Sequence, residues 1–376
     1  MTERIGLMTH FADVSDPRRG QGKRHLLSDI LQLTICAVLS GANTWVEIEE
    51  YGESKRDWLE TFLTLAHGIP SHDTLGDVFA RLNPDELEAG FQRWVSNLAT
   101  AITDAQIRID GKVLRGSANA RREKKPLHLV SAWVSEAQVI LGQVKTDDQS
   151  NEITAIPELL KLLVVEGALV TIDAIGTQTD IAKQIIAQGG DYLLAVKGNH
   201  KTMLDDLDDL FTGCDEVGFA DVAHDRAKTV NKGHGRIEIR HCQTLFDPQY
   251  LAYVGRHADW KDLNTLIRVQ RERRINDQTT TETAYFISSR AASAAYFLDA
   301  VRGHWAIENQ LHWSLDVTFR EDYNQTRTGF AAENLALVRR LALMLLKRET
   351  SVKVGLQVKR LRAGWHNNYL LKVLNG

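Results

Sequence analysis

Apolar residues in the first hundred positions recur with the spacing of helices. Between residues 26 and 38 they fall at intervals of three and four, which places them on one helical face. Further helices are predicted over 46–64 and 75–82, and side-chain oxygens in 71–74 are placed to cap the second of these. The pattern predicts an all-α N-terminal domain over residues 1–103.

After about residue 104 the pattern changes to short β-type runs. Three strand-like segments come first, at 107–110, 128–134 and 139–146. Helix and strand then alternate, at 153–166, 168–173, 179–188 and 192–196. A β-α-β pattern requires parallel pairing. Three meandering strands followed by this pattern predict an α/β fold with a ribonuclease-H-like core.

Between about residues 201 and 290 the signal is strand-rich and irregular, which predicts a β-rich insertion in the second domain. Its predicted strands are 236–242, 263–271 and 283–288. Helical periodicity resumes at residue 295. The predicted domains are therefore the helical N-terminal unit, a core over 104–350 that contains the insertion, and a basic C-terminal tail over 351–376.

The composition is that of an ordinary globular protein. The chain has 376 residues, of which 43% are hydrophobic and 25% charged, so neither a disordered nor a membrane class is favoured. The apolar stretch 26–45 is interrupted by too many polar residues to span a membrane, and residues 1–11 lack a secretory signal. The three cysteines form no C-x-x-C pair. We therefore expect no membrane association and a bacterial cytoplasmic location.

The net charge of −4 hides two segregated runs. Residues 201–225 are strongly acidic. Residues 333–376 carry nine lysines and arginines against two glutamates, which is the sign of a phosphate-facing segment. A solvated helix face is an equally good interpretation of both runs.

Two aspartates are predicted to stand where strands end. Asp110 follows the apolar run 107–109 and precedes Gly111, and Asp173 follows the run 170–172. Carboxylates at strand ends of an α/β sheet lie where such folds bind ligands. Taken singly, each aspartate is more often a turn former or a helix cap, so the case depends on their convergence.

A third acid is predicted on the helix 298–317. Glu308 has His304 one turn before it and His312 one turn after it, on a single stripe bordered by tryptophans. An ordinary amphipathic helix would place Leu or Ala there. A surface helix with an Arg302 or histidine salt partner is the structural alternative.

Two metal chemistries are consistent with these residues. Three carboxylates, Asp110, Asp173 and Glu308, suit two Mg²⁺ ions that cut a phosphodiester. Alternatively His304, Glu308 and His312 would bind zinc, as in another class of hydrolase. The zinc set leaves the two aspartates without a role, so we rank it lower.

Several polar clusters follow these acids closely. The basic group after Asp110 consists of Lys112, Arg115, Arg121, Arg122, Lys124 and Lys125. Lys197 follows a predicted strand, and the turn 233–236 presents His234 and Arg236. Each is a candidate phosphate contact, although a turn-forming role is at least as good an interpretation of each alone.

Five strings give the chain a close resemblance to the H-repeat-associated (ISAs-type) insertion-sequence transposases of the DDE superfamily. They are Ile109-Asp110-Gly111-Lys112-Val113-Leu114-Arg115-Gly116-Ser117, Thr171-Ile172-Asp173-Ala174, Leu194-Ala195-Val196-Lys197-Gly198-Asn199, Gly233-His234-Gly235-Arg236 and His304-Trp305-Ala306-Ile307-Glu308-Asn309-Gln310-Leu311-His312-Trp313. The likeness extends into the N-terminal domain through 16–18 and 70–74. It spans nearly the whole chain in the right order.

The resemblance implies a transposase with a ribonuclease-H-like catalytic core and a β-rich insertion before the glutamate. By position, Asp110, Asp173 and Glu308 match the family's acidic triad, with Mg²⁺ or Mn²⁺, two ions, as cofactor. Two departures stand outside the triad. His200 occupies a position where Gln is expected, and Gln325 one where Arg is usual.

The implied partner is double-stranded DNA, both the terminal inverted repeats and the target, bound by a homodimer associated with the nucleoid. The predicted DNA contacts are Lys112, Arg115, Lys197, His234, Arg236, Arg302, His304, Asn309 and Arg327. The expected reaction is cleavage and joining of the ends of an insertion sequence. A catalytically silent DNA-binding remnant of such an element is the alternative.

Overall fold

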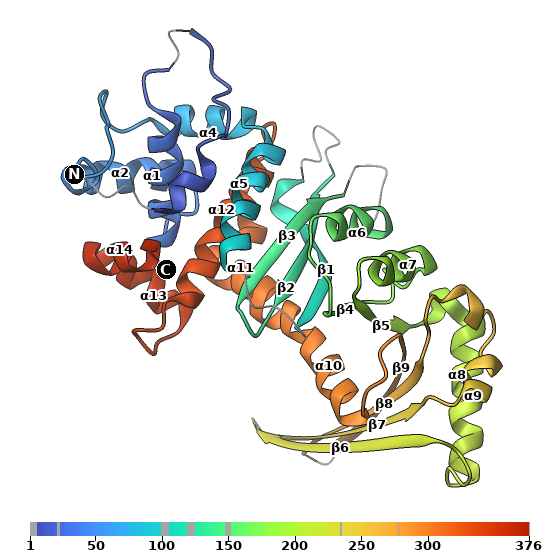
Figure 1. Cartoon of the computed structure of the whole chain (residues 1–376). Coiled ribbons are helices and arrows are strands. Elements are labelled where there is room, and N and C mark those ends of the chain that lie inside the picture. The colour runs from blue at the N-terminus through green and yellow to red at the C-terminus, as the bar shows by residue number, and fades with distance from the viewer. Residues whose placement is uncertain are drawn as a thin grey trace.

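A computed structural model describes residues 6–20, 23–98, 105–118, 125–146, 152–233, 235–276 and 278–375. A helical region built from both ends of the chain lies on one side of a central mixed sheet, and a long β-arm leaves the other side (Figure 1). Within the described residues, no helix is long and apolar enough to cross a membrane.

The central sheet has nine strands in the order β3-β2-β1-β4-β5-β9-β8-β7-β6. The first five are β1 (Gln106–Leu114), β2 (Leu127–Val134), β3 (Val139–Lys145), β4 (Leu169–Ile172) and β5 (Asp191–Val196). Strands β1, β4 and β5 pair in parallel, and the other neighbours are antiparallel. The prediction of an α/β, ribonuclease-H-like fold is confirmed.

Helices cover both faces of this sheet. Helices α6 (Glu152–Lys161) and α7 (Thr179–Ala187) pack against each other, α6 on β2 and β3 and α7 on β5. Helix α10 (Ala294–Ala306) lies against β1, β4 and the insertion strands. Successive side chains of a strand point to opposite faces, so β1 divides its residues between the two helical layers.

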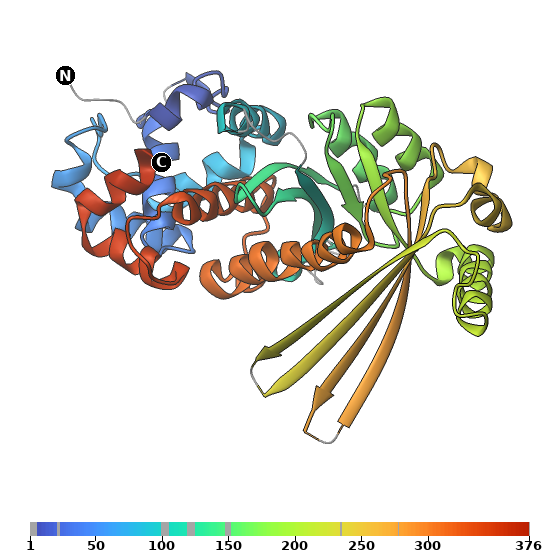
Figure 2. The same cartoon turned by 60° about the horizontal axis from the view of Figure 1, so that its bottom comes forward.

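The insertion extends the same sheet. Strands β6 (His224–Gly233), β7 (Arg236–Leu245), β8 (Thr265–Ile275) and β9 (Gln278–Ser288) form two long hairpins, and β9 pairs with β5. Figure 2 shows both hairpins projecting well beyond the core. The β-rich prediction is thus right, but β6 was missed because its outer half is polar and exposed.

The acidic run of residues 201–225 contains helix α8 (Lys201–Glu216), which agrees with the interpretation of that run as a solvated helix face. Its Leu207 and Phe211 are buried, whereas most of its aspartates face solvent. Asp215 is also exposed, but it accepts two hydrogen bonds of 2.7 Å from the buried Arg268 of β8. The helix therefore anchors the base of the arm.

The N-terminal helices are α1 (Leu27–Leu39), α2 (Trp45–Ser54), α3 (Arg56–Leu59), α4 (His72–Arg81) and α5 (Pro84–Leu98). Ser71 accepts a hydrogen bond from the Thr74 amide and caps α4 as predicted. The single helix expected over 46–64 is two helices, broken at Lys55. The predicted domain boundary at 103/104 lies outside the described residues.

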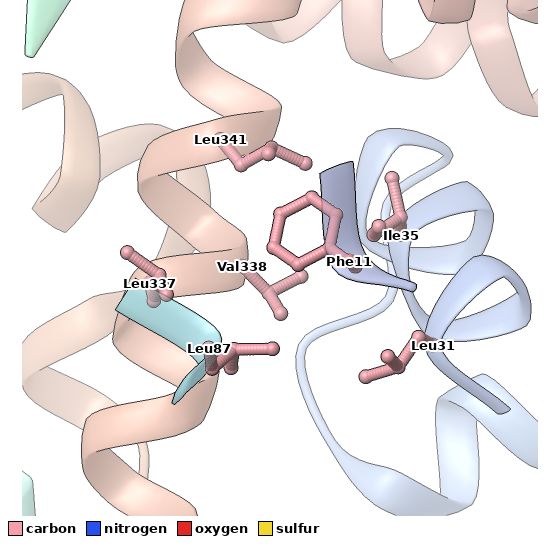
Figure 3. Close-up of a pocket in the computed structure, with 7 residues that line it drawn as sticks. All are labelled: Phe11, Leu31, Ile35, Leu87, Leu337, Val338 and Leu341. Carbon is pink, nitrogen blue, oxygen red and sulfur yellow. The ribbon is translucent and has the colours of Figure 1, made fainter. Parts of the chain in front are cut away.

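The chain's C-terminal part is helical and returns to the N-terminal helices. Helix α12 (Ala331–Arg348) packs on α1, α4 and α5, and α13 (Leu356–Trp365) and α14 (Asn367–Asn375) complete the bundle (Figure 1). Figure 3 shows the contact, where Phe11, Leu31 and Leu341 line an apolar cavity. Its volume of about 10 Å³ is that of a packing gap, too small for a ligand.

This packing corrects the prediction of a basic C-terminal tail over 351–376. Two of its cationic side chains, Lys359 and Arg360, are buried and donate hydrogen bonds to backbone carbonyls. A segment that docks through these two charged groups is part of the helical bundle and not a loose tail, although Lys353, Arg362 and Lys372 remain exposed.

Candidate active site

The register of two parallel strands brings Asp110 and Asp173 together. The last paired residues of β1 and β4 are Ile109 and Ile172, and each aspartate is the next residue in its chain. Because paired residues on parallel strands advance together, both carboxylates stand at the same edge of the β1–β4 ladder.

The structure changes one detail of this placement. Asp110 was expected at the end of its strand, but β1 continues to Leu114 through pairing with β2 alone. The aspartate lies instead where β1 and β4 part. Gly111, which suggested a strand end, is required for another reason: a side chain at this position would collide with Glu152 and His128 on the opposite face of the sheet.

Asp173 is both a turn former and a member of this site. Its Oδ1 accepts hydrogen bonds from the amides of Ile175 at 3.1 Å and Gly176 at 3.4 Å. These bonds fix the carboxylate in the loop after β4 and use one of its two oxygens. Asp173 therefore forms the turn, as the alternative interpretation expects, and its Oδ2 can still bind a ligand.

Glu308 lies in a short π-helical turn, Ile307–His312, between α10 and α11 (Trp313–Phe319). π-helical turns are rare and often occur at functional sites, because they change which side chains face a partner. His304 Nδ1 lies 3.0 Å from Thr171 Oγ1, and His312 Nδ1 lies 3.5 Å from Asp110 Oδ2. Glu308 is exposed.

Negative charge is concentrated around Asp110. Burial, together with the charges of Asp173, Glu152 and Glu308, raises the pKa of Asp110 to about 7. The neighbouring imidazoles do not offset this charge, because burial lowers the pKa of His304 to about 4 and that of His312 to about 3. Both histidines are therefore neutral at pH 7 and do not counter the charge of these acids.

This donor set fits hard divalent cations, which prefer carboxylate oxygens. In the part of the chain that the structure describes, no three His, Cys, Asp or Glu side chains are gathered tightly enough to form a finished metal site. The zinc set of His304, Glu308 and His312 forms no such group among these residues either, and the Nδ1 atoms of the two histidines contact Thr171 and Asp110. The carboxylate site is supported by the negative charges around Asp110 and by the β1–β4 register that brings Asp110 and Asp173 together.

A polar stripe along β1 faces the α10–α11 segment. The Gln106 amide donates to the Ala300 carbonyl at 2.7 Å, and Lys112 Nζ lies 2.6 Å from Asp316. Lys112 is 8% exposed. The prediction that it contacts DNA is therefore corrected: its ammonium group ties β1 to α11.

Other predicted DNA contacts fall into two groups. Arg115, Lys197, Arg236, Arg302 and Asn309 are exposed. His304 is packed against β4, and Arg327 donates to the Gly116 carbonyl at 3.1 Å, so neither is presented freely. His234 lies outside the described residues, as do Arg121, Arg122 and Lys124.

Arg302 lines a cleft that is larger than the apolar gap in the helical bundle. This cleft, of about 490 Å³, lies between α10 and the start of β1 and is lined also by Gln106, Arg108 and Tyr296. None of the three predicted acids lines it. The cleft and the acid cluster are thus separate features of the same strand and helix.

Sequence reasoning missed Glu152 and its partner His128. Glu152 Oε1 lies 2.9 Å from His128 Nε2, and the glutamate adds its charge to the surroundings of Asp110. The sequence does show an acid just before the helix predicted from residue 153. Acids are common at helix starts because they interact favourably with the helix dipole, so this one did not stand out.

Two family models match the chain in succession. One is described as DDE_Tnp_1-associated and covers residues 8–95, and the other is described as Transposase DDE domain and covers residues 103–345. The chain belongs to the DDE transposase family. Members of this family are DNA transposases, so the resemblance noted in the sequence is confirmed.

Full-length relatives of this DDE transposase agree. It is 39% identical to "H repeat-associated putative transposase YhhI" of Escherichia coli K12 over 98% of both chains. It is also 39% identical to "Putative transposase YncI" of Escherichia coli O157:H7 over 98% of this chain and 94% of the relative. A piggyBac transposase synaptic complex with hairpin DNA aligns over 95% of this chain and 75% of its own, with 10% identity and a TM-score of 0.45.

Proposed function

We propose that this DDE transposase cleaves and joins the ends of an insertion sequence at a site formed by Asp110, Asp173 and Glu308. The observation that carries the proposal is the β1–β4 register, which sets the two aspartates at adjacent positions of parallel strands. The third acid approaches from the π-helical turn and adds its charge to the surroundings of Asp110.

The three carboxylates would hold two Mg²⁺ or Mn²⁺ ions. Bound divalent ions supply the activation of water and the stabilisation of the leaving oxygen in an in-line phosphodiester displacement. The protein's part is to hold the carboxylates in position, and a bound cation would favour the ionised form of Asp110 that burial disfavours. The turn after β4 fixes Asp173, and His312, neutral beside Asp110, limits the movement of that side chain.

DNA would approach along the side of the sheet that α10 occupies. Val269 and Cys242 pair across β8 and β7 and pack with α10. Further out on the same face stand three cationic side chains, Arg236, Arg271 and Arg273. The guanidinium of Arg271 lies 5.9 Å from the ring centre of Trp305 on α10.

This arm face therefore continues the surface that carries Glu308. Exposed cations supply sequence-independent contacts to phosphates. We assign the arm face, together with Arg115, Lys197, Arg302 and Asn309, to terminal-repeat and target DNA. A homodimer would hold the two element ends during strand transfer.

The test is metal-dependent cleavage of DNA that carries the element ends. Asp110→Asn, Asp173→Asn and Glu308→Gln should each abolish cleavage while DNA binding persists. Asp180→Asn is the matched control, because Asp180 is an exposed carboxylate whose ion pair with Lys183, at 3.4 Å, is a surface pair. Melting curves show whether each variant is folded.

Two results would count against the proposal. Cleavage that survives Asp110→Asn or Glu308→Gln would remove these residues from the chemistry. Metal-indifferent binding of element ends without nicking by the unaltered protein would favour a catalytically silent remnant.

A further inference from the structure

A gap in the sheet lies immediately beside Asp110. Residue 111 is a glycine, and by strand alternation its missing side chain would point to the face opposite the Asp110 carboxylate. A Cβ atom there would lie 2.6 Å from both the carboxyl carbon of Glu152 and Nε2 of His128. The two side chains therefore occupy the space that only a glycine leaves open.

Glu152 reaches this gap from the opposite helical layer. It is the first residue of α6, and its side chain is 12% exposed. His128, on β2 opposite Val113, holds the carboxylate through a contact of 2.9 Å. A fourth carboxylate thus lies against the backbone of β1 one residue after Asp110.

The charge of Glu152 acts on both aspartates of the site. It raises the pKa of Asp110, and its own pKa is raised by burial and then by the charge of Asp173. His128 is its one ion-pair partner among the described residues. A carboxylate kept beside two others in partly buried surroundings is costly unless a cation shares the site.

We propose that Glu152 is a fourth carboxylate of the divalent-metal site, supplied by α6 through the gap at Gly111 and positioned by His128. The inference rests on the proposed function, because it concerns the same metal site. It divides the ligands between the two faces of the sheet: Glu308 comes from the α10 face and Glu152 from the α6 face.

Mn²⁺ binding to the full-length protein without DNA tests this assignment, by titration calorimetry or by the electron paramagnetic resonance of free Mn²⁺. Glu152→Gln keeps the size of the side chain and removes its charge. We expect a loss of Mn²⁺ affinity of about tenfold to hundredfold. Glu152→Asp retains the charge and should recover part of the affinity.

Glu158→Gln is the matched control on the same helix. Glu158 is 59% exposed and pairs with Lys161 at 2.7 Å, so its replacement should leave Mn²⁺ affinity unchanged. Equal affinities for Glu152→Gln and the unaltered protein, while Asp110→Asn loses binding, would overturn this inference alone. Unchanged binding in Asp110→Asn would instead overturn the proposed function.

A second variant covers the case in which Glu152→Gln does not fold. Gly111→Ala leaves every charge in place but displaces the Glu152 carboxylate and the His128 ring. It should weaken Mn²⁺ binding in the same direction. In a folded double variant with Glu152→Gln the losses should not add, because both changes remove one interaction. Fully additive losses, or normal Mn²⁺ binding by Gly111→Ala, would contradict the assignment.

Discussion

Two basic regions of this transposase use their cations in opposite ways. In the C-terminal helices, Arg340 and Arg360 are buried and bonded to oxygens of the protein itself. In the β-arm, Arg236 and Arg273 are exposed near the ends of the long hairpins. Both regions are basic in the sequence, so the sign of a charged run does not reveal whether its partner is internal or external.

Arg360 shows how a buried cation stabilises the helical bundle. Its guanidinium donates to the carbonyls of Val38 at 2.8 Å, Thr318 at 2.6 Å and Ala42 at 2.7 Å. One planar group with five donors thereby satisfies the carbonyls at the end of α1 and near the end of α11. The side chain joins three segments that are distant in sequence and, at 2% exposure, is not open to phosphate.

The arm offers the reverse situation. Arg236 and Arg271 are 42% and 38% exposed, and their ion pairs with Glu238 and Glu282 are surface pairs. Surface ion pairs contribute about 0–1 kcal/mol and exchange readily for other anions. The same chemical group is therefore structural in the bundle and available for phosphates in the arm.

The largest effect should come from breaking the buried pair of Arg340 and Glu321, whose side chains are both 0% exposed and 2.9 Å apart. Arg340→Met leaves an uncompensated buried carboxylate and should lower the free energy of unfolding by about 3–5 kcal/mol. Urea unfolding followed by tryptophan fluorescence measures this. Adding Glu321→Gln should restore part of the loss. Unchanged stability would mean that this cation is not structural.

Replacing the arm cations should affect binding and not stability. Gln at Arg236, Arg271 and Arg273 should weaken binding to element-end DNA by about tenfold or more and reduce the salt slope by up to about 3. The melting temperature should stay the same. Salt titrations of binding followed by fluorescence anisotropy measure the slope.

The arm provides its own control for that experiment. Lys228, Lys232 and Arg274 lie on the opposite face of the hairpins, as the pairing of Ile237 with Lys232 and Arg274 shows. Gln at these three positions changes the charge equally and should affect binding much less. Equal losses from both faces would mean that charge alone matters and that the α10 side is not the DNA path.

The smallest effect concerns Glu88 of α5, which lies within electrostatic range of Arg340 and accepts a hydrogen bond from the Gln143 amide of β3. Burial raises the pKa of Glu88 to about 7. The folded state therefore holds its proton more tightly than the unfolded state, and stability falls as the pH rises from about 4.5 to about 7.

Glu88→Gln should remove that loss. We expect a gain of about 1 kcal/mol at pH 8, because the side chain keeps some contact with solvent, and no gain at pH 4. Urea unfolding at the two pH values decides the matter. A gain at both would show that the hydrogen bonds of Gln, not the titration of Glu88, are responsible.

Much of the fold could be predicted because it follows from local patterns. The order of the five core strands and the capped start of α4 depend on periodicity and on a few neighbouring residues. Strand β6 was missed, and helix α8 was only one of two interpretations of its acidic run, for the converse reason. The acidic run masked the buried stripe of α8, and the polar outer half of β6 is held by pairing with β7 and not by burial.

The candidate site divides in the same way. Asp110, Asp173 and Glu308 could be singled out from the sequence, since each stands in a distinctive string. The π-helical turn and the approach of Glu152 to Gly111 could not, because both depend on contacts between segments that are far apart in the chain.

The sequence by itself determined which elements form, in which order, and to which family the chain belongs. Only the tertiary structure decided which charged groups face inward. Lys112 and Arg360 are cations like Arg115 and Arg273, but a carboxylate or a set of carbonyls from a distant segment satisfies the first two. The reason is that local spacing sets the direction of a side chain, whereas the fold supplies the oxygen atoms that it meets.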